Sequence, residues 1–176
     1  MKILLVVPVR EGKIGYYVTP PLGLGYLATA LRREGHEVAI LDCIRRRLDF
    51  SGFETAVRER QPCLVGFQTF SSDMVSVRRS ADIVKGLRPD TVVVVGGPHP
   101  SGDPEGTMGF LPHVDYAFQG EGEVGLPLLA KYLESREEGT DVLPEKIPGL
   151  IWRKNSLVKR NASAYVEDLD SLGMPS

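Results

Sequence analysis

The chain has 176 residues, of which 42% are hydrophobic and 25% are charged, and its formal net charge is −2. This profile is typical of one soluble globular domain and excludes a strongly basic nucleic-acid-binding protein. The first apolar run ends at Pro8, too early for a secretion signal or a membrane span, so we expect a cytoplasmic protein with no nucleic-acid or membrane partner.

Five apolar runs have the composition of β-strands: residues 2–8, 37–42, 63–68, 91–96 and 115–120. Helical patterns separate them. Leu24, Leu27, Ala28 and Leu31 form one stripe with Gly35 as its C′ residue, and further helices are expected near residues 53–60, 74–87, 104–111 and 126–133. Cys63 opens an apolar strand and is therefore expected in the core.

This alternation of strands and helices predicts an α/β fold with a five-stranded, parallel, doubly wound sheet. We expect the flavodoxin-like strand order 2-1-3-4-5, which brings the loops after strands 1, 3, 4 and 5 together at one edge. Residues 149–160 predict a C-terminal β-hairpin that turns at Lys154 and Asn155. We expect a domain over residues 1–138, followed by a hairpin and linker over residues 139–176.

The loops at this edge are poor in bulky side chains. "GGPHPSGD" follows strand 4, where two glycines allow a ligand to approach the backbone, and Pro98 and Pro100 are expected to hold an extended path. "TFSSD" follows strand 3, and one of Ser72 or Asp73 is expected to cap the next helix. "GEGE" follows strand 5, where Glu123 has two interpretations, ligand contact or complement to a helix dipole. No nucleophile stands beside a base, so the edge predicts a binding surface without catalytic residues.

Other nucleotide- and phosphate-binding proteins of this fold class fit less well. "GLGYLA" (residues 23–28) matches a dinucleotide fingerprint, but it begins some fifteen residues after the strand that it should follow directly. A phosphoreceiver domain would need acidic residues after strands 1 and 3, and flavodoxin a phosphate loop after strand 1. His99 has no second ligand beside it in sequence, so no metal site is predicted.

The segments "PPLGLGYLATALRREGHEVAILD", "LVGFQTFSSD", "VVVVGGPHPSGDPE", "VDYAFQGEGE", "IPGLIWR" and "EDLDSLGMP" together resemble a known family. The chain is similar to the N-terminal cobalamin-binding domain of B12-dependent radical SAM enzymes, the group of anaerobic magnesium-protoporphyrin monomethyl ester cyclase-like proteins and methyltransferases. The resemblance implies a corrin over the four loops, a nucleotide tail reaching into the domain, and an upper face turned to a radical SAM domain later in the same chain.

The resemblance also implies which residues contact the cofactor, four groups from four loops. They are Thr19, Pro20 and Gly23; Phe70, Ser71 and Ser72; Gly96, Gly97, His99, Pro100 and Ser101; and Gly120, Glu121 and Gly122.

Two motifs known from related enzymes are absent. Without D-x-H-x-x-G after strand 1, we expect base-off cobalamin with no histidine ligand from this chain. Without C-x₃-C-x₂-C, a [4Fe-4S] cluster and S-adenosylmethionine would have to be held by a further part of the protein. By itself the present chain is expected to be inactive. With that part, methyl transfer to carbon or phosphorus, or ring formation or rearrangement, is implied.

Two alternatives of another class stay open at this point. The same fold could serve as a corrin-free docking domain, or as the N-terminal half of a glycosyltransferase, which the opening "MKILLVVP" with "LATALRREGHEV" resembles.

Overall fold

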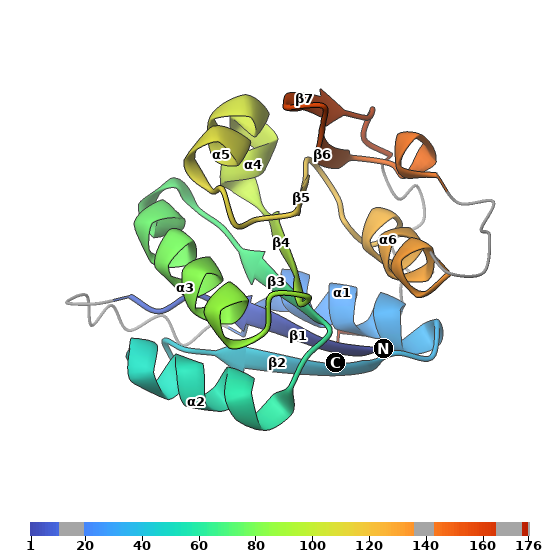
Figure 1. Cartoon of the computed structure of the whole chain (residues 1–176). Helices are drawn as coiled ribbons and strands as arrows, with labels where there is room; N and C mark the ends of the chain where they lie inside the picture. Colours follow the sequence, from blue (N-terminus) through green and yellow to red (C-terminus); the bar gives the residue numbers. More distant parts are fainter. Residues whose placement is uncertain (11–19, 136–142, 165–173, 176) are drawn as a thin grey trace.

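The computed structural model describes residues 1–10, 20–135, 143–164 and 174–175, and a seven-stranded sheet forms its centre (Figure 1). The strands are β1 (Lys2–Val7), β2 (Glu37–Asp42), β3 (Leu64–Gln68), β4 (Val92–Gly96), β5 (Tyr116–Phe118), β6 (Leu150–Lys154) and β7 (Leu157–Arg160). Their order is β2-β1-β3-β4-β5-β6-β7. Pairing is parallel from β2 through β5 and antiparallel from β5 through β7.

The expectation of a purely parallel, five-stranded sheet is therefore corrected. The predicted hairpin does not stand apart, because β6 pairs with β5 and extends the same sheet. Leu150 and Ile151 are fully buried and Trp152 nearly so. Burial of these apolar side chains stabilises the hairpin against β5, where it covers the edge of the parallel strands. The sheet is mixed and has seven strands.

Helices cover both faces of the sheet (Figure 1). Helices α1 (Leu22–Arg33) and α6 (Gly125–Glu134) pack on one face. Helices α2 (Phe50–Arg60), α3 (Met74–Leu87) and α5 (Pro104–Phe110) pack on the other. The remaining helical segments are short: α4 (Pro98–Gly102), η1 (Ser71–Asp73) and η2 (Pro144–Lys146). Because both faces are covered, β1, β3 and β4 are almost continuously apolar, as the sequence predicts.

The end of the first helix, the hairpin turn and the burial of Cys63 can each be compared with the sequence prediction. Gly35 ends the first helix at φ +84°, as predicted for a C′ glycine. The hairpin turn lies one residue later than predicted, at Asn155 and Ser156, whose φ angles are both positive, as a two-residue turn between twisted strands requires. Cys63 is exposed rather than part of the core.

Pro98 and Pro100 also differ from expectation. They do not hold an extended path but lie in the short helix α4, with Pro98 as its first residue. The fixed φ of proline suits the first turn of a helix, where a backbone N–H would have no acceptor within the helix in any case.

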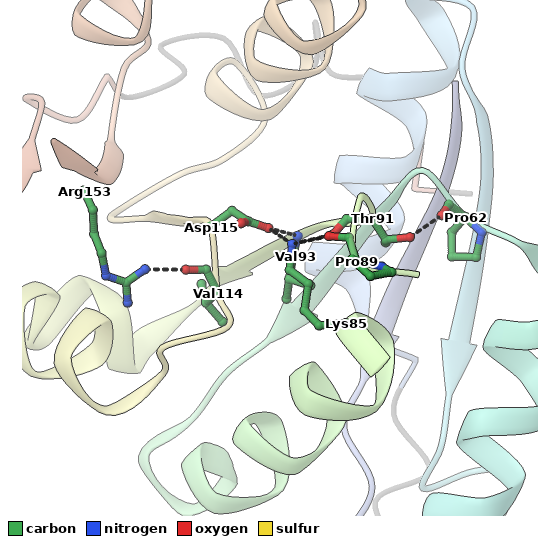
Figure 2. A network of polar contacts seen from close by, with 8 residues as sticks. All are labelled: Pro62, Lys85, Pro89, Thr91, Val93, Val114, Asp115 and Arg153. Atoms are coloured by element: carbon green, nitrogen blue, oxygen red, sulfur yellow. Dashed lines mark hydrogen bonds and ion pairs between the residues drawn. The ribbon is translucent and has the colours of Figure 1, made fainter. Parts of the chain in front are cut away.

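A polar network fixes the amino ends of β4 and β5, opposite the edge with the predicted loops (Figure 2). Lys85 Nζ donates to Asp115 Oδ2 at 2.7 Å and to the carbonyl of Thr91 at 2.8 Å. The N–H of Val93 donates to the same Asp115 oxygen at 2.8 Å. Helix α3 and two strands are thereby held together far from the candidate site.

Arg153 attaches the hairpin to the rest of the fold (Figure 2). Its guanidinium donates to the carbonyls of Val114 at 2.6 Å and Leu111 at 2.9 Å, and also to that of Met108. Burial lowers the pKa of Arg153 from its usual value. One side chain thus satisfies carbonyls at the end of α5 and binds β6 to that helix.

Over the residue ranges given above, no helix combines the length and the apolar character needed to cross a bilayer.

Candidate cofactor-binding site

The candidate site lies at the carboxyl edge of the parallel strands, where β1 is flanked by β2 and β3 and successive crossovers run in opposite directions. Ligands of open α/β sheets bind at such a switch point. The described parts of the loops at this edge comprise residues 8–10 and 20–21, 69–73, 97–103 and 119–124. Every predicted contact residue within the described ranges belongs to one of these loops, to an adjoining short helix or to the bordering end of a strand or helix. Thr19 lies outside the described residues.

The loops after β3 and β4 are bonded to each other. The N–H of Thr69 donates to the carbonyl of Gly96 at 2.8 Å, and the N–H of His99 donates to the carbonyl of Thr69 at 3.2 Å. His99 Nδ1 lies 2.9 Å from Ser71 Oγ. His99 and Ser71, both predicted as site residues, therefore form a pair across two loops.

Ser101 joins the loop after β4 to the loop after β5. Its hydroxyl donates to the carbonyl of Gly97 at 2.8 Å and accepts from the N–H of Gly120 at 3.0 Å. Pro100 is buried beside it. Ser101 and Pro100 thus help to hold the shape of the edge.

An ion pair that sequence reasoning missed fixes the loop after β3. Arg10 follows β1, and its Nε and Nη2 lie 2.7 Å and 3.0 Å from the two carboxylate oxygens of Asp73. Asp73 is fully buried and also accepts from the N–H of Phe70 at 3.2 Å. Asp73, one of the two expected caps, is the residue before α3, but its carboxylate bonds backward to Phe70 and Arg10.

A cavity of ≈ 240 Å³ opens under these loops, between the sheet and helices α1 and α6. Its wall is apolar apart from backbone, Gln68 and two carboxylates. The lining residues are Leu5, Gly23, Leu24, Leu27, Gly66, Phe67, Gln68, Val94, Val95, Gly96, Gly97, Phe118, Gly120, Glu121, Gly122, Glu123 and Leu126. Six predicted contact residues are among them.

Glycines make this cavity possible. A Cβ added at Gly96 or Gly23 would meet no atom within 4 Å, so the space beside each is open. Gly97 has φ +112°, and a Cβ there would lie 3.1 Å from the carbonyl oxygen of Thr69. Gly97 is therefore required by the backbone, whereas Gly96 and Gly23 leave room for a ligand.

A second hollow, of ≈ 480 Å³, lies on the β1–β2 side of the edge and shares Gln68 with the cavity. Pro20, Phe70 and Ser72, three further predicted contacts, line it together with Arg10. The structure therefore groups the predicted residues that it describes around two adjoining depressions and two polar links, Ser71 to His99 and Ser101 to Gly120.

The floor of the cavity was not predicted. Leu5, Gly66 and Phe67 belong to strands whose apolar character indicated only a buried core. Gly66 carried the one available signal, because a glycine inside an apolar strand often marks close approach of another group. A Cβ at Gly66 would lie 3.1 Å from Leu5 Cδ2.

The "B12 binding domain" family model matches residues 13–130. The chain belongs to the B12-binding domain family. The match contains all the predicted contact residues and most of the residues that line the four loops and both depressions. The recognition made from sequence motifs is thereby confirmed, and cobalamin binding is supported over the corrin-free and glycosyltransferase alternatives.

Relatives of this B12-binding domain are much longer proteins. It is 34% identical to an uncharacterized methyltransferase of Pyrococcus horikoshii, over 100% of this chain and 38% of that protein. It is 26% identical to the anaerobic magnesium-protoporphyrin IX monomethyl ester cyclase of Synechocystis, over 97% of this chain and 34% of the cyclase. The chain thus spans little more than a third of each.

A solved structure agrees with this grouping. The radical S-adenosylmethionine methyltransferase TsrM from Kitasatospora setae, with cobalamin and a [4Fe-4S] cluster bound, superposes with a TM-score of 0.75 at 26% identity. The superposition covers 99% of the present chain and 31% of TsrM.

Proposed function

We propose that this domain holds cobalamin across the carboxyl edge of its sheet and presents it to a radical SAM domain of the same protein. The observation that carries the proposal is the apolar cavity beneath loops whose glycines leave space for a ligand. A large cofactor with an apolar aromatic base at the end of a flexible tail suits a narrow apolar cavity under an open rim. Cobalamin, when bound, supplies a cobalt centre able to carry a methyl group.

The chain's own residues would position the cofactor and exclude water from its lower side. In this proposal the nucleotide tail enters the cavity beside Gly96 and Gly122, and the corrin lies against the rim. The proposed contacts are Thr19, Pro20, Gly23, Phe70, Ser71, Ser72, Gly96, Gly97, His99, Pro100, Ser101, Gly120, Glu121 and Gly122.

We propose further that cobalamin binds base-off with no histidine from this chain on cobalt. The described residues that follow β1 are Pro8, Val9 and Arg10 instead of a histidine motif, and Arg10 is paired with Asp73. His99 is paired with Ser71 at 2.9 Å, which supports a role as an edge contact.

We assign the cofactor surface to residues 1–138 and the approach to the next domain to residues 139–176. The rest of the protein would provide the [4Fe-4S] cluster, S-adenosylmethionine and most substrate contacts. The lengths of the relatives and the cofactors bound to TsrM support this division of labour. Methyl transfer is the reaction we favour, because a methyltransferase is the relative at 34% identity.

The test is to purify the chain, add hydroxocobalamin, remove free pigment by gel filtration and record the visible spectrum. We expect retained cobalamin at a stoichiometry near one. A colourless protein would overturn the proposal. For the axial ligand, an electron paramagnetic resonance spectrum of the cob(II)alamin complex is expected to lack nitrogen superhyperfine splitting, and splitting from a protein imidazole would contradict it.

A further inference from the structure

Glu123 has a feature that none of the predicted contacts explains. It lies just before α6 and lines the cavity, and its Oε2 is buried without a hydrogen-bond partner in the described part of the chain. Buried polar atoms of folded proteins nearly always have a partner, and an orphan acceptor destabilises the fold. A carboxylate oxygen that is buried against a cavity without a protein donor is therefore available to a donor that a ligand brings.

The surroundings define the chemistry of that donor. Burial raises the pKa of Glu123 above its ordinary value and the charge of Glu121 adds to the effect, while backbone hydrogen bonding at Glu123 and Gly122 partly opposes it. None of the described residues in the cavity wall is a lysine, arginine or histidine. The buried Glu123 carboxylate, in a described wall without these cationic side chains, disfavours a phosphate or carboxylate beside it and favours a neutral hydroxyl or amide donor.

We propose that Glu123 Oε2 accepts a hydrogen bond from a ribose hydroxyl of the cobalamin nucleotide tail. This inference rests on the proposed function and adds a residue to it. Cobalamin carries neutral donors in two places, the ribose hydroxyls of the tail and the amide groups around the corrin. The oxygen is buried, so its donor must enter the cavity, and the tail is the part of the cofactor narrow enough to do so.

The experiment compares cobalamin with cobinamide, which keeps the corrin and its amides but lacks the nucleotide tail. Hydroxocobalamin and dicyanocobinamide are titrated by absorbance into the wild-type chain, Glu123→Ala and Glu123→Gln. Glu59→Gln is the matched control, because Glu59 is an exposed glutamate on α2, away from the cavity.

We expect Glu123→Ala to weaken cobalamin binding about 10- to 100-fold, as the loss of a hydrogen bond to a charged group would. Glu123→Gln keeps a neutral acceptor, so the loss of cobalamin affinity in this variant should be smaller. Cobinamide affinity should be the same for all four proteins. The cofactor-free Glu123→Gln protein should melt at a higher temperature than the wild type at pH 7, because an amide costs less to bury than a carboxylate.

Failure of this inference is distinct from failure of the proposed function. If the wild type does not bind cobalamin, the proposed function fails first. If the wild type binds and Glu123→Ala binds equally well, the inference is wrong. An equal loss for cobinamide would place the donor on the corrin and also overturn it. So would a loss of affinity that merely follows a lower melting temperature, since Glu123 would then have a structural role.

Discussion

Arg10 and Asp73, 63 residues apart in sequence, form a two-pronged ion pair with contacts of 2.7 Å and 3.0 Å at the rim of the site. The Asp73 side chain is 0% exposed, whereas that of Arg10 is 30% exposed. The pair joins the loop after β1 to the loop after β3, and Phe70, Ser71 and Ser72 take their positions from it. Because only Asp73 is fully buried, removal of Arg10 and removal of the Asp73 charge should have different effects on stability.

We expect Arg10→Met to destabilise the chain more than Asp73→Asn. Loss of Arg10 leaves a fully buried carboxylate without its cation, which costs about 3 kcal/mol. Asp73→Asn keeps an acceptor for the N–H of Phe70 and leaves an arginine that can turn to water, at about 1–2 kcal/mol. Urea unfolding followed by circular dichroism measures both. The reverse ranking would show that the bond to Phe70, not the ion pair, dominates.

Gly96→Val should weaken cobalamin binding while the fold survives. A Cβ at this position meets nothing within 4 Å, and valine suits a strand, so melting temperature should change little. The added methyl groups would occupy the cavity and reduce affinity at least about tenfold, equivalent to about 1.4 kcal/mol.

The control for this variant is Gly86→Ala in α3, where a Cβ also meets nothing within 4 Å but the cavity is remote. Its cobalamin affinity should equal that of the wild type. Undiminished binding by Gly96→Val would show that the cofactor does not use this cavity.

The raised pKa of Glu123 makes a prediction about pH for the cofactor-free chain. Because the pKa is higher in the folded than in the unfolded chain, the ionised carboxylate weakens the fold. The penalty is absent below the unfolded pKa, grows as pH rises, and is complete above the folded pKa. The stability advantage of Glu123→Gln should therefore be present at pH 7 and shrink as the solution is acidified. Melting curves at several pH values check this, and an advantage that grows on acidification would contradict it.

The two thiols should differ in reactivity. Burial raises the pKa of Cys43 to about 12, so its thiolate is scarce at pH 8, whereas Cys63 is exposed. Titration with Ellman's reagent should release one equivalent of thionitrobenzoate quickly from the native chain and two from the denatured chain. Cys63→Ser should remove the fast equivalent. Two fast equivalents from the native wild type would show that the Cys43 region opens readily.

Patterns within single segments were enough to predict much of this protein. Continuous apolar runs revealed β1, β3 and β4, because strands covered on both faces need no polar side. Gly35 was identifiable as a helix end, since only its local backbone matters. The loop glycines and small polar residues pointed to a binding edge, and the motif set pointed to the cobalamin-binding family.

Other features depended on which segments meet. The hairpin was predicted, but its pairing with β5 was not, because its partner is 34 residues away across a helix. Helix α4 was missed because two prolines suit an extended path and a first helical turn equally well. No sequence spacing could pair Arg10 with Asp73 or Ser71 with His99.

The sequence by itself determined that strands and helices alternate, that four bare loops share an edge, and that the chain has the motifs of a B12-binding domain. Only the tertiary structure decided that a cavity lies beneath those loops, that Leu5 and Gly66 floor it, and that one oxygen of Glu123 is left without a donor inside it. The physical reason is that backbone preference and burial are local properties of a segment. A cavity and an unpaired atom are defined only by the surfaces that distant segments fail to fill.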